Sequence, residues 1–271
     1  MLERFQRSLE LTKQSYRVLM QDKELLLLPV LSGLAILLVV GSFGVGVFAL
    51  NGFEEPQNEY TSALFGLAFY VSSYTIAFFF QAALIAGALE RMAGGDPTLG
   101  SALSAAGRRI GPILLWGLVA GTVGMLIKSI QERGNLVTKI VMALVGTAWS
   151  LATWFMVTVL VMERRPLGDS FKRSTSLFKS TWGETFVGRL GMGAAQVVVA
   201  LAIVLLVLPL ALVSEIAAIV TGATLLVVAG VFFSALNGVY TASLYRYATS
   251  REVAPGFDRG LLEGAFQKKT E

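Results

Sequence analysis

Six long stretches of this chain carry no charged side chain, and each is long enough to cross a membrane as a helix. They are Leu25–Leu50, Thr61–Leu89, Ile110–Ile127, Ile140–Met162, Leu190–Val213 and Ile216–Tyr245. A helix needs about 20 mostly apolar residues to cross a hydrocarbon core. Charged residues make up only 15% of the 271 residues, against about 25% in soluble proteins. The sequence therefore predicts an all-α, polytopic membrane protein with six transmembrane helices, forming a single membrane domain over residues 1–271.

The lysines and arginines predict the orientation, because basic loops stay in the cytoplasm. If the six stretches alternate in direction, 19 of the 22 basic residues fall on one side, which also holds both termini. The loop over 51–60 on the other side has three glutamates and no basic residue. We therefore expect a multi-pass protein of the cell membrane (plasma or inner membrane) with cytoplasmic N- and C-termini. The basic segment 128–139 is the exception to this pattern.

A similar sequence recurs at the cytoplasmic end of every second stretch. The tripeptides are Leu89-Glu90-Arg91, Met162-Glu163-Arg164 and Leu244-Tyr245-Arg246. A proline follows each of them and opens a short amphipathic segment. This pattern predicts a threefold internal repeat of an interfacial helix and a membrane hairpin. The predicted copies are 1–91, 97–164 and 166–246, with an amphipathic tail over 247–271.

Apolar residues three and four positions apart predict that residues 2–20 form a helix lying on the membrane surface. Two further such helices are predicted, one after Pro97 and one after Pro166, and the second has basic residues on its other faces. The alternative is an ordinary cytoplasmic loop with helical character. The side chains expected to contact the membrane are Phe5, Leu9, Tyr16, Phe171, Phe178 and Trp182. The expected partners are lipids of the anionic cytoplasmic leaflet, and a second copy or another membrane protein; nucleic acid is not expected.

Two stretches resemble an uncharacterised family of prokaryotic six-helix membrane proteins. One runs from Ser15 to Ser32 and contains Asp22-Lys23-Glu24-Leu25-Leu26-Leu27-Leu28-Pro29; the other is Ser176-Leu177-Phe178-Lys179-Ser180-Thr181-Trp182-Gly183-Glu184. The resemblance implies a prokaryotic membrane protein and assigns no catalytic residue. The plan of an interfacial helix with a hairpin is more distantly similar to the membrane domain attached to some glycerophosphodiester phosphodiesterases, whose soluble catalytic domain this chain lacks.

The chain has no histidine and no cysteine. It therefore has no thiol nucleophile, no imidazole base and no histidine or cysteine ligand for a metal. The spans also contain no carboxylate, which argues against a proton pump with a buried acid. We predict no cofactor and no metal site.

Uncharged polar residues lie on the even-numbered spans. They are Tyr74 and Gln81 on the second, Trp154 and Thr158 on the fourth, and Ser234, Asn237 and Thr241 on the sixth. We favour hydrogen bonding between helices as their role. The alternative is a polar groove that holds a lipid headgroup or a solute.

Small residues four positions apart also mark helix contacts, because they let two helices approach closely. The third span has two such pairs, Gly107/Gly111 and Gly117/Gly121.

Carboxylates at the cytoplasmic boundary leave open the alternative that the protein is an enzyme. Glu90 and Glu163 occupy matching repeat positions, but each precedes an arginine that would pair with it. The sequence thus favours a protein that is not an enzyme and that binds or moves a lipid or small amphiphile, or serves as a membrane scaffold. The alternative is an interfacial enzyme that acts on lipid headgroups through these carboxylates.

Overall fold

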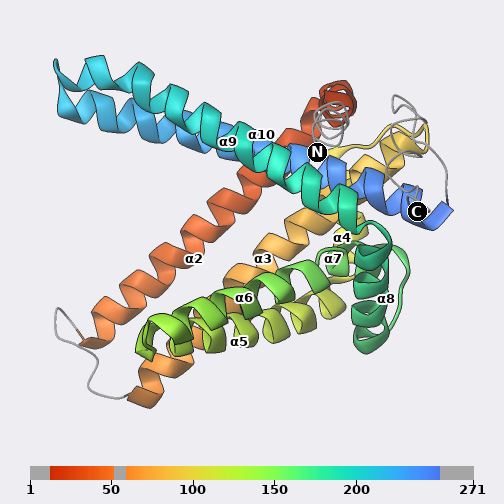
Figure 1. The fold of residues 1–271 in the computed structure, drawn as a ribbon, viewed down its shortest axis with the longest axis horizontal. Coiled ribbons are helices and arrows are strands. Elements are labelled where there is room, and N and C mark those ends of the chain that lie inside the picture. The colour runs from red at the N-terminus through yellow and green to blue at the C-terminus, as the bar shows by residue number, and fades with distance from the viewer. Residues whose placement is uncertain (1–12, 52–58, 251–271) are drawn as a thin grey trace. The chain divides into compact units, whose positions relative to one another are not determined.

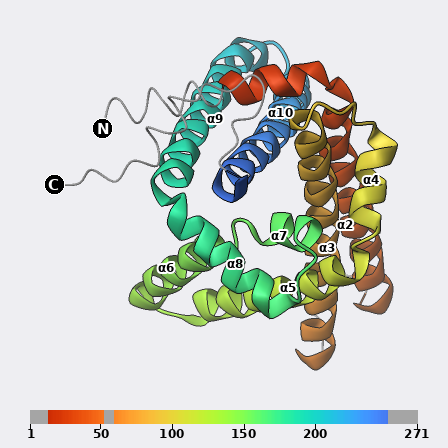
Figure 2. The same cartoon turned by 90° about the vertical axis from the view of Figure 1, so that its right-hand side faces the viewer.

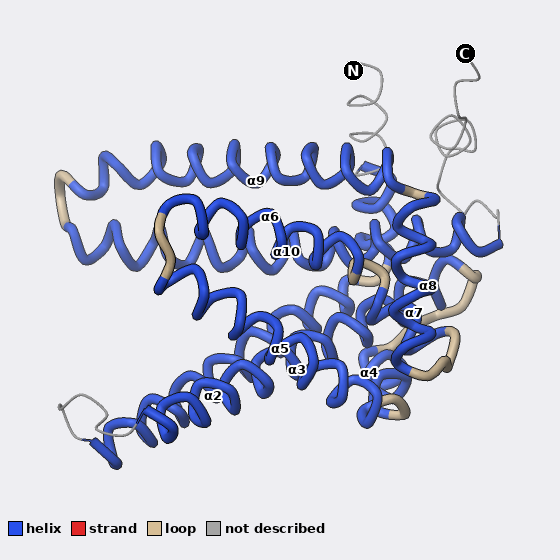
Figure 3. The backbone as a smooth tube through the Cα atoms, turned by 60° about the horizontal axis from the view of Figure 1, so that its bottom comes forward, coloured by secondary structure: helices blue, strands red, loops and turns tan. Residues whose placement is uncertain are grey.

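The structure, a computed structural model, describes residues 13–51 and 59–250, and all regular structure in this part of the chain is helical (Figure 1). A helix over 13–21 comes first. The elements after it are η1 (Lys23–Leu26), α2 (Leu27–Asn51), α3 (Glu59–Met92), α4 (Leu99–Gly107), α5 (Ile110–Arg133), α6 (Leu136–Ala152), α7 (Met156–Met162), α8 (Leu167–Ser180), α9 (Trp182–Ala211) and α10 (Glu215–Ser250). Figure 3 shows how little of the described chain lies outside helices.

Six described segments are long and apolar enough to cross a membrane. They are Lys23–Ala49, Tyr60–Met92, Ile110–Arg133, Leu136–Met162, Gly191–Ala211 and Glu215–Ser250. The prediction of an all-α chain with six apolar helices of membrane length is confirmed. Their large apolar side chains are often exposed, for example Leu38 (72%) and Leu205 (69%). Such surfaces suit contact with hydrocarbon.

The basic segment 128–139 forms the facing ends of two helices, and only residues 134 and 135 lie between them. α5 continues past Ile127 to Arg133, and Lys128 pairs with Glu132 one turn later (3.7 Å). Asn135 caps α6, because its side-chain oxygen accepts a hydrogen bond from the Thr138 N–H (2.9 Å). The predicted span ended too early because its boundary was placed at the first charge.

The chain divides into two compact units. Of the residues that the structure describes, the first unit comprises 13–29, 87–99 and 179–250, and the second comprises those within Val30–Ala86 and Gly100–Phe178. In the first unit, α9 and α10 form a long antiparallel hairpin (Figure 1). Leu19, Leu25 and Tyr240 are completely buried in its core.

Close approach of α3 and α5 holds part of the second unit together. A Cβ atom added at Gly117 would lie 2.2 Å from Thr75 Oγ1, and one at Gly121 would lie 3.0 Å from the backbone nitrogen of Val71. The predicted contact through Gly117 and Gly121 is therefore confirmed. Gly107 and Gly111 have no protein atom within 4 Å of that position, so this pair makes no such contact in the described chain.

A short helix precedes a pair of long helices three times along the chain: residues 13–21, α4 and α8. Whether the three copies are equivalent, and whether the short helices lie on the membrane surface, stay predictions. Tyr16 is 44% exposed, and its ring lies 5.9 Å from that of Phe232. The expected contacts Phe5 and Leu9 lie outside the described residues.

Candidate functional site

The fourth membrane segment is interrupted. α6 ends at Ala152, α7 begins at Met156, and Thr153, Trp154 and Phe155 form a turn between them. The span predicted over Ile140–Met162 lies within a segment of membrane-spanning length, Leu136–Met162, but the sequence did not predict the turn that divides this segment into two helices. The three turn residues are β-branched or aromatic and are weaker helix formers than leucine. Thr153 Oγ1 also donates to the Trp149 carbonyl (2.8 Å).

Ser174 of α8 supplies the hydrogen bonds that the interruption removes. Its hydroxyl donates to the Ala152 carbonyl (2.8 Å) and accepts from the Phe155 N–H (3.2 Å). Ser174 is completely buried. One side chain thus replaces backbone partners on both sides of the break, as non-helical backbone inside a membrane protein requires. Figure 2 shows α8 beside α7.

α8 packs through a face of which the apolar pattern identified only Phe178. Its buried residues are Ser170, Ser174, Leu177 and Phe178. The expected membrane contacts are placed differently: Phe178 is only 7% exposed, which leaves little of its ring for lipid. Phe171 is half-buried, 5.8 Å from the Trp149 ring. The side chain of Trp182 lies outside the described part. Serines four residues apart, at 170 and 174, were the signal that could have identified this face.

A cluster of charges lies at the end of α7. Glu163 accepts hydrogen bonds from Arg165 Nε (2.5 Å) and Arg173 Nε (3.0 Å), one on each carboxylate oxygen. Burial by itself raises the pKa of Glu163, but the hydrogen bonds and charges of the two arginines outweigh it, and the pKa is lowered overall. Arg164 adopts a left-handed backbone (φ 53°), which reverses the chain between α7 and α8. Glu163 is therefore an ionised carboxylate at neutral pH.

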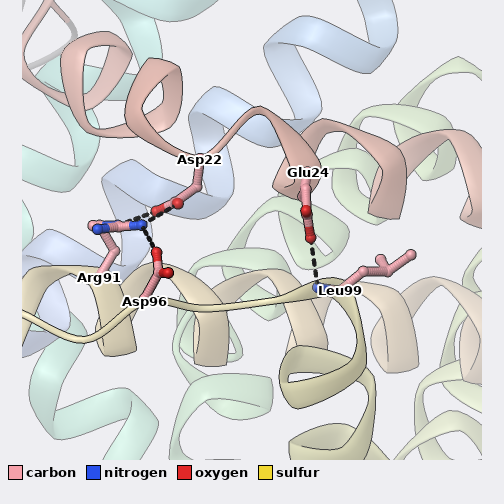
Figure 4. A network of polar contacts seen from close by, with 5 residues as sticks. All are labelled: Asp22, Glu24, Arg91, Asp96 and Leu99. Atoms are coloured by element: carbon pink, nitrogen blue, oxygen red, sulfur yellow. Dashed lines mark hydrogen bonds and ion pairs between the residues drawn. The ribbon is translucent and has the colours of Figure 1, made fainter.

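Another polar cluster lies in the first unit (Figure 4). Arg91, near the end of α3, donates two hydrogen bonds to Asp22 and one to Asp96 (2.6 Å). Asp22 is 8% exposed. The Leu99 N–H, at the start of α4, donates to Glu24 Oε2 (3.1 Å). The segment before α2 is thus held to both ends of the link between α3 and α4.

The residues of the predicted polar groove are divided between the two units. Tyr74, Gln81, Trp154 and Thr158 belong to the second unit, and Ser234, Asn237 and Thr241 to the first. Thr158 is completely buried, and its hydroxyl has no hydrogen-bond partner in the described protein. Thr241 Oγ1 donates to the carbonyl of Asn237 in its own helix (2.8 Å). Asn237 is half-buried and Ser234 is exposed. The groove itself stays a prediction.

An aromatic row runs through the second unit from α3 to α8. Neighbouring ring centroids are 5.5–6.3 Å apart, in the order Tyr70, Tyr74, Phe78, Trp116, Trp149 and Phe171. These rings come from α3, α5, α6 and α8, so the row ties the interrupted span to its neighbours.

The described residues contain no group of three or more acidic side chains placed to hold a metal ion. Glu90 is exposed. Glu163 already has an arginine on each oxygen. The chemistry that the described site offers is hydrogen bonding from hydroxyl and backbone groups beside aromatic rings.

Comparison with known proteins gives one result. A model of a family of unknown function (DUF6159) matches residues 60–255, more than two thirds of the chain. The stretch 176–184 lies inside this match and the stretch from Ser15 to Ser32 lies before it. No curated protein and no solved structure matches the chain. The chain thus belongs to this family of unknown function, as its resemblance to an uncharacterised family of membrane proteins led us to expect.

Proposed function

We propose that this protein binds or moves a lipid or small amphiphile in a prokaryotic cell membrane, without catalysing a reaction on it. The observation that carries the proposal is the interrupted fourth span. Broken helices in membrane proteins commonly lie at substrate sites, where the freed backbone serves a ligand or a moving part. Here the break lies beside a buried hydroxyl, that of Thr158, for which the described protein supplies no partner.

Without Ser174 the break would be costly. Each unpaired backbone group in a hydrocarbon environment costs several kcal/mol. Ser174 supports the break from a different helix, so a small movement of α8 would expose the Ala152 carbonyl and the Phe155 N–H to a ligand. A polar headgroup can replace the serine hydroxyl in both hydrogen bonds.

The test is lipid retention by a pair of matched variants. Thr158→Val removes only the unpaired hydroxyl, and Thr147→Val removes a hydroxyl that already bonds the Ala143 carbonyl (2.8 Å). We expect native mass spectrometry to show several-fold less co-purified lipid on Thr158→Val, with an unchanged melting temperature, and no loss on Thr147→Val. Equal retention by both variants would refute a ligand role for the break.

The same measurement separates a groove from simple helix packing. Gln81→Leu and Asn237→Leu should change stability by about 1–2 kcal/mol and leave lipid retention intact if these side chains only join helices. Loss of a retained lipid with unchanged stability would extend the binding site to these residues.

We propose the cytoplasm as the side of both termini, on the basic residues of the loops. A reporter that is active only outside the cytoplasm should be silent after residues 22, 168 and 271 and active near Asn58 and Asn135. Activity at Lys179 would contradict the six-span arrangement.

The second candidate is an interfacial enzyme that acts on lipid headgroups. Arginine pairing on both oxygens of Glu163 disfavours it, because a general acid must hold a proton near neutral pH. Release of lipid phosphorus by purified protein, dependent on Mg²⁺ and lost in Glu90→Gln or Glu163→Gln, would support the enzyme and overturn the first proposal.

A further inference from the structure

One short stretch of α8 contacts the fourth span at its break. Phe171 lies against Trp149 of α6, with ring centroids 5.8 Å apart. Ser174 bonds the backbone at both edges of the break, and Thr175 Oγ1 adds a longer hydrogen bond to the Ala152 carbonyl (3.4 Å). α8 therefore covers the end of α6 and the turn that follows it.

The same stretch also contacts the far end of α7. Arg173 Nε donates to Glu163 Oε1 (3.0 Å), and Glu163 is the residue that follows α7. Phe155, the residue before α7, donates its N–H to Ser174 (3.2 Å). Two neighbouring side chains of α8 thus bind the two ends of α7 (Figure 2). Lifting α8 from the break therefore also requires Arg173 to leave Glu163.

The ion pair is open to solvent, whereas the hydrogen bonds at the break are not. The side chain of Arg173 is 35% exposed and that of Glu163 is 13% exposed. Ser174 is completely buried. Dissolved ions screen a partly exposed ion pair and weaken it. Of the contacts that hold α8 down, the pair of Arg173 with Glu163 is thus one that the surrounding solution can loosen.

The link between α7 and α8 adds a force in the opposite direction. α7 ends at Met162 and α8 begins at Leu167, and Arg164 between them has a left-handed backbone (φ 53°). This conformation is unfavourable for a residue that has a side chain, and it persists only where surrounding contacts hold it. The contacts of α8 with α7 must offset this strain.

We propose that α8 is a lid over the break and that the ion pair of Arg173 with Glu163 is the latch of this lid. While the latch is closed, Ser174 occupies the backbone groups of the break and excludes a ligand. When it opens, the Ala152 carbonyl and the Phe155 N–H become available to a polar headgroup. This inference rests on the lipid site proposed above and adds what controls access to it. Arg173 is a positioning residue, because it acts through Ser174.

Arg165 provides a matched control for the latch. Its Nε donates to the other oxygen of Glu163 (2.5 Å), but Arg165 belongs to the link and not to α8. Arg173→Met and Arg165→Met each remove one charge-assisted hydrogen bond from the same carboxylate. Only Arg173→Met removes a contact between α8 and the end of α7.

The first experiment measures how often α8 lifts. The chain has no cysteine, so Ser170→Cys places a single thiol on the buried face of α8, where Ser170 is completely buried. We expect a maleimide to label this thiol about five- to tenfold faster when Arg173→Met is added. Arg165→Met should leave the rate unchanged. Ser176→Cys, at an exposed position of the same helix, should be labelled at one rate in all three backgrounds.

The second experiment uses salt and a conservative variant. Raising the ionic strength from about 0.01 M to about 1 M shortens the Debye length from about 30 Å to about 3 Å. Labelling of Ser170→Cys should become faster with salt, and adding Arg173→Met should make it fast at both ionic strengths. Arg173→Lys keeps the charge and should restore part of the slow labelling. A general loss of stability would not depend on salt in this way, and melting temperatures would reveal it.

The third experiment measures access of lipid. Deuterated phosphatidylglycerol is added to protein that holds the unlabelled lipid, and native mass spectrometry follows the replacement. We expect Arg173→Met to exchange its lipid faster than the wild type and Arg165→Met, by about the same factor as the labelling rate.

Two outcomes overturn the lid. Equal labelling of Ser170→Cys in the Arg173→Met and Arg165→Met backgrounds would show that the ion pair does not hold α8. Faster labelling with unchanged lipid exchange would show that α8 lifts without controlling the ligand. Retention of lipid by Thr158→Val judges the site itself, so a failure of the lid and a failure of the site are told apart.

Discussion

Ser174 donates a hydrogen bond of 2.8 Å to the carbonyl oxygen of Ala152, the last residue of α6, although 22 residues separate them. The same hydroxyl accepts the Phe155 N–H on the other side of the break. A segment of membrane-spanning length is therefore completed by a side chain from the helix that follows it. Thr175 of α8 adds a longer hydrogen bond to the same carbonyl (3.4 Å), so α8 is joined to the break by two neighbouring residues.

The first prediction is that Ser174→Ala destabilises the protein. It leaves the Phe155 N–H without its partner and the Ala152 carbonyl with only the longer hydrogen bond from Thr175 Oγ1 (3.4 Å), at a cost of about 1–3 kcal/mol. Ser176→Ala, on the exposed face of the same helix, should cost nothing measurable. Thermal unfolding in detergent measures the difference, and hydrogen exchange should increase at residues 153–158 in Ser174→Ala alone.

Similar stability for the two serine variants would contradict this account. Ordered water would then be able to replace the hydroxyl at the break, and α8 would not control the fourth span.

The six spans were predictable because membrane insertion depends on local composition. About 20 apolar residues in a row mark a helix whatever its neighbours are. The break at Thr153–Phe155 was not predictable in this way. It contains no glycine or proline, and the two backbone groups beside it are paired by Ser174 of a different helix, a residue that the apolar pattern did not mark.

The contacts within the polar clusters could not be predicted from the local sequence either. A close helix contact at Gly117 was indicated by a local spacing of small residues, although its partner, α3, was not. The pairing of Asp22 with Arg91 joins residues 69 positions apart, and no local pattern specifies such a partner. Asp22 and Glu24 both lie in the stretch that carried the resemblance to a family, but their contacts became visible only in the folded chain.

The second prediction concerns the Asp22–Arg91 pair. Asp22 is 8% exposed and Arg91 23%, whereas Asp96 is 91% exposed. Asp22→Asn should therefore lower stability by about 1.5–3 kcal/mol, the range for hydrogen bonds to charged groups. Asp96→Asn should lower it by less than about 1 kcal/mol. Chemical unfolding of both variants tests this order, and a larger effect at Asp96 would reverse our assignment of the principal contact.

The third prediction follows from the lowered pKa of Glu163. A carboxylate with a lower pKa in the folded state than in the unfolded state contributes stability above its unfolded pKa. That contribution is lost as the pH falls through the folded pKa. The wild type should therefore be more stable than Glu163→Gln at pH 7, and the difference should shrink below about pH 4.

Melting temperatures between pH 3 and pH 7 test the effect. Asp169→Asn, which changes an exposed carboxylate at the start of α8, is the control and should lie within about 0.5 kcal/mol of the wild type at pH 7. A gap between wild type and Glu163→Gln that stays constant over this range would mean that the pairing with Arg165 and Arg173 does not stabilise the fold.

The last prediction uses two glycines in opposite surroundings. A Cβ at Gly117 would lie 2.2 Å from Thr75 Oγ1 and 3.1 Å from Thr75 Cα, so Gly117→Ala must push α3 and α5 apart. Such overpacking costs about 1–3 kcal/mol. Gly41, inside α2, has no protein atom within 4 Å of the same position. Gly41→Ala should therefore stabilise its helix by up to about 1 kcal/mol.

Adding Thr75→Ala to Gly117→Ala removes the nearest oxygen but keeps the backbone contact, so we expect the double variant to recover part of the lost stability. If Gly117→Ala were as stable as Gly41→Ala, the close packing of α3 against α5 would be wrong.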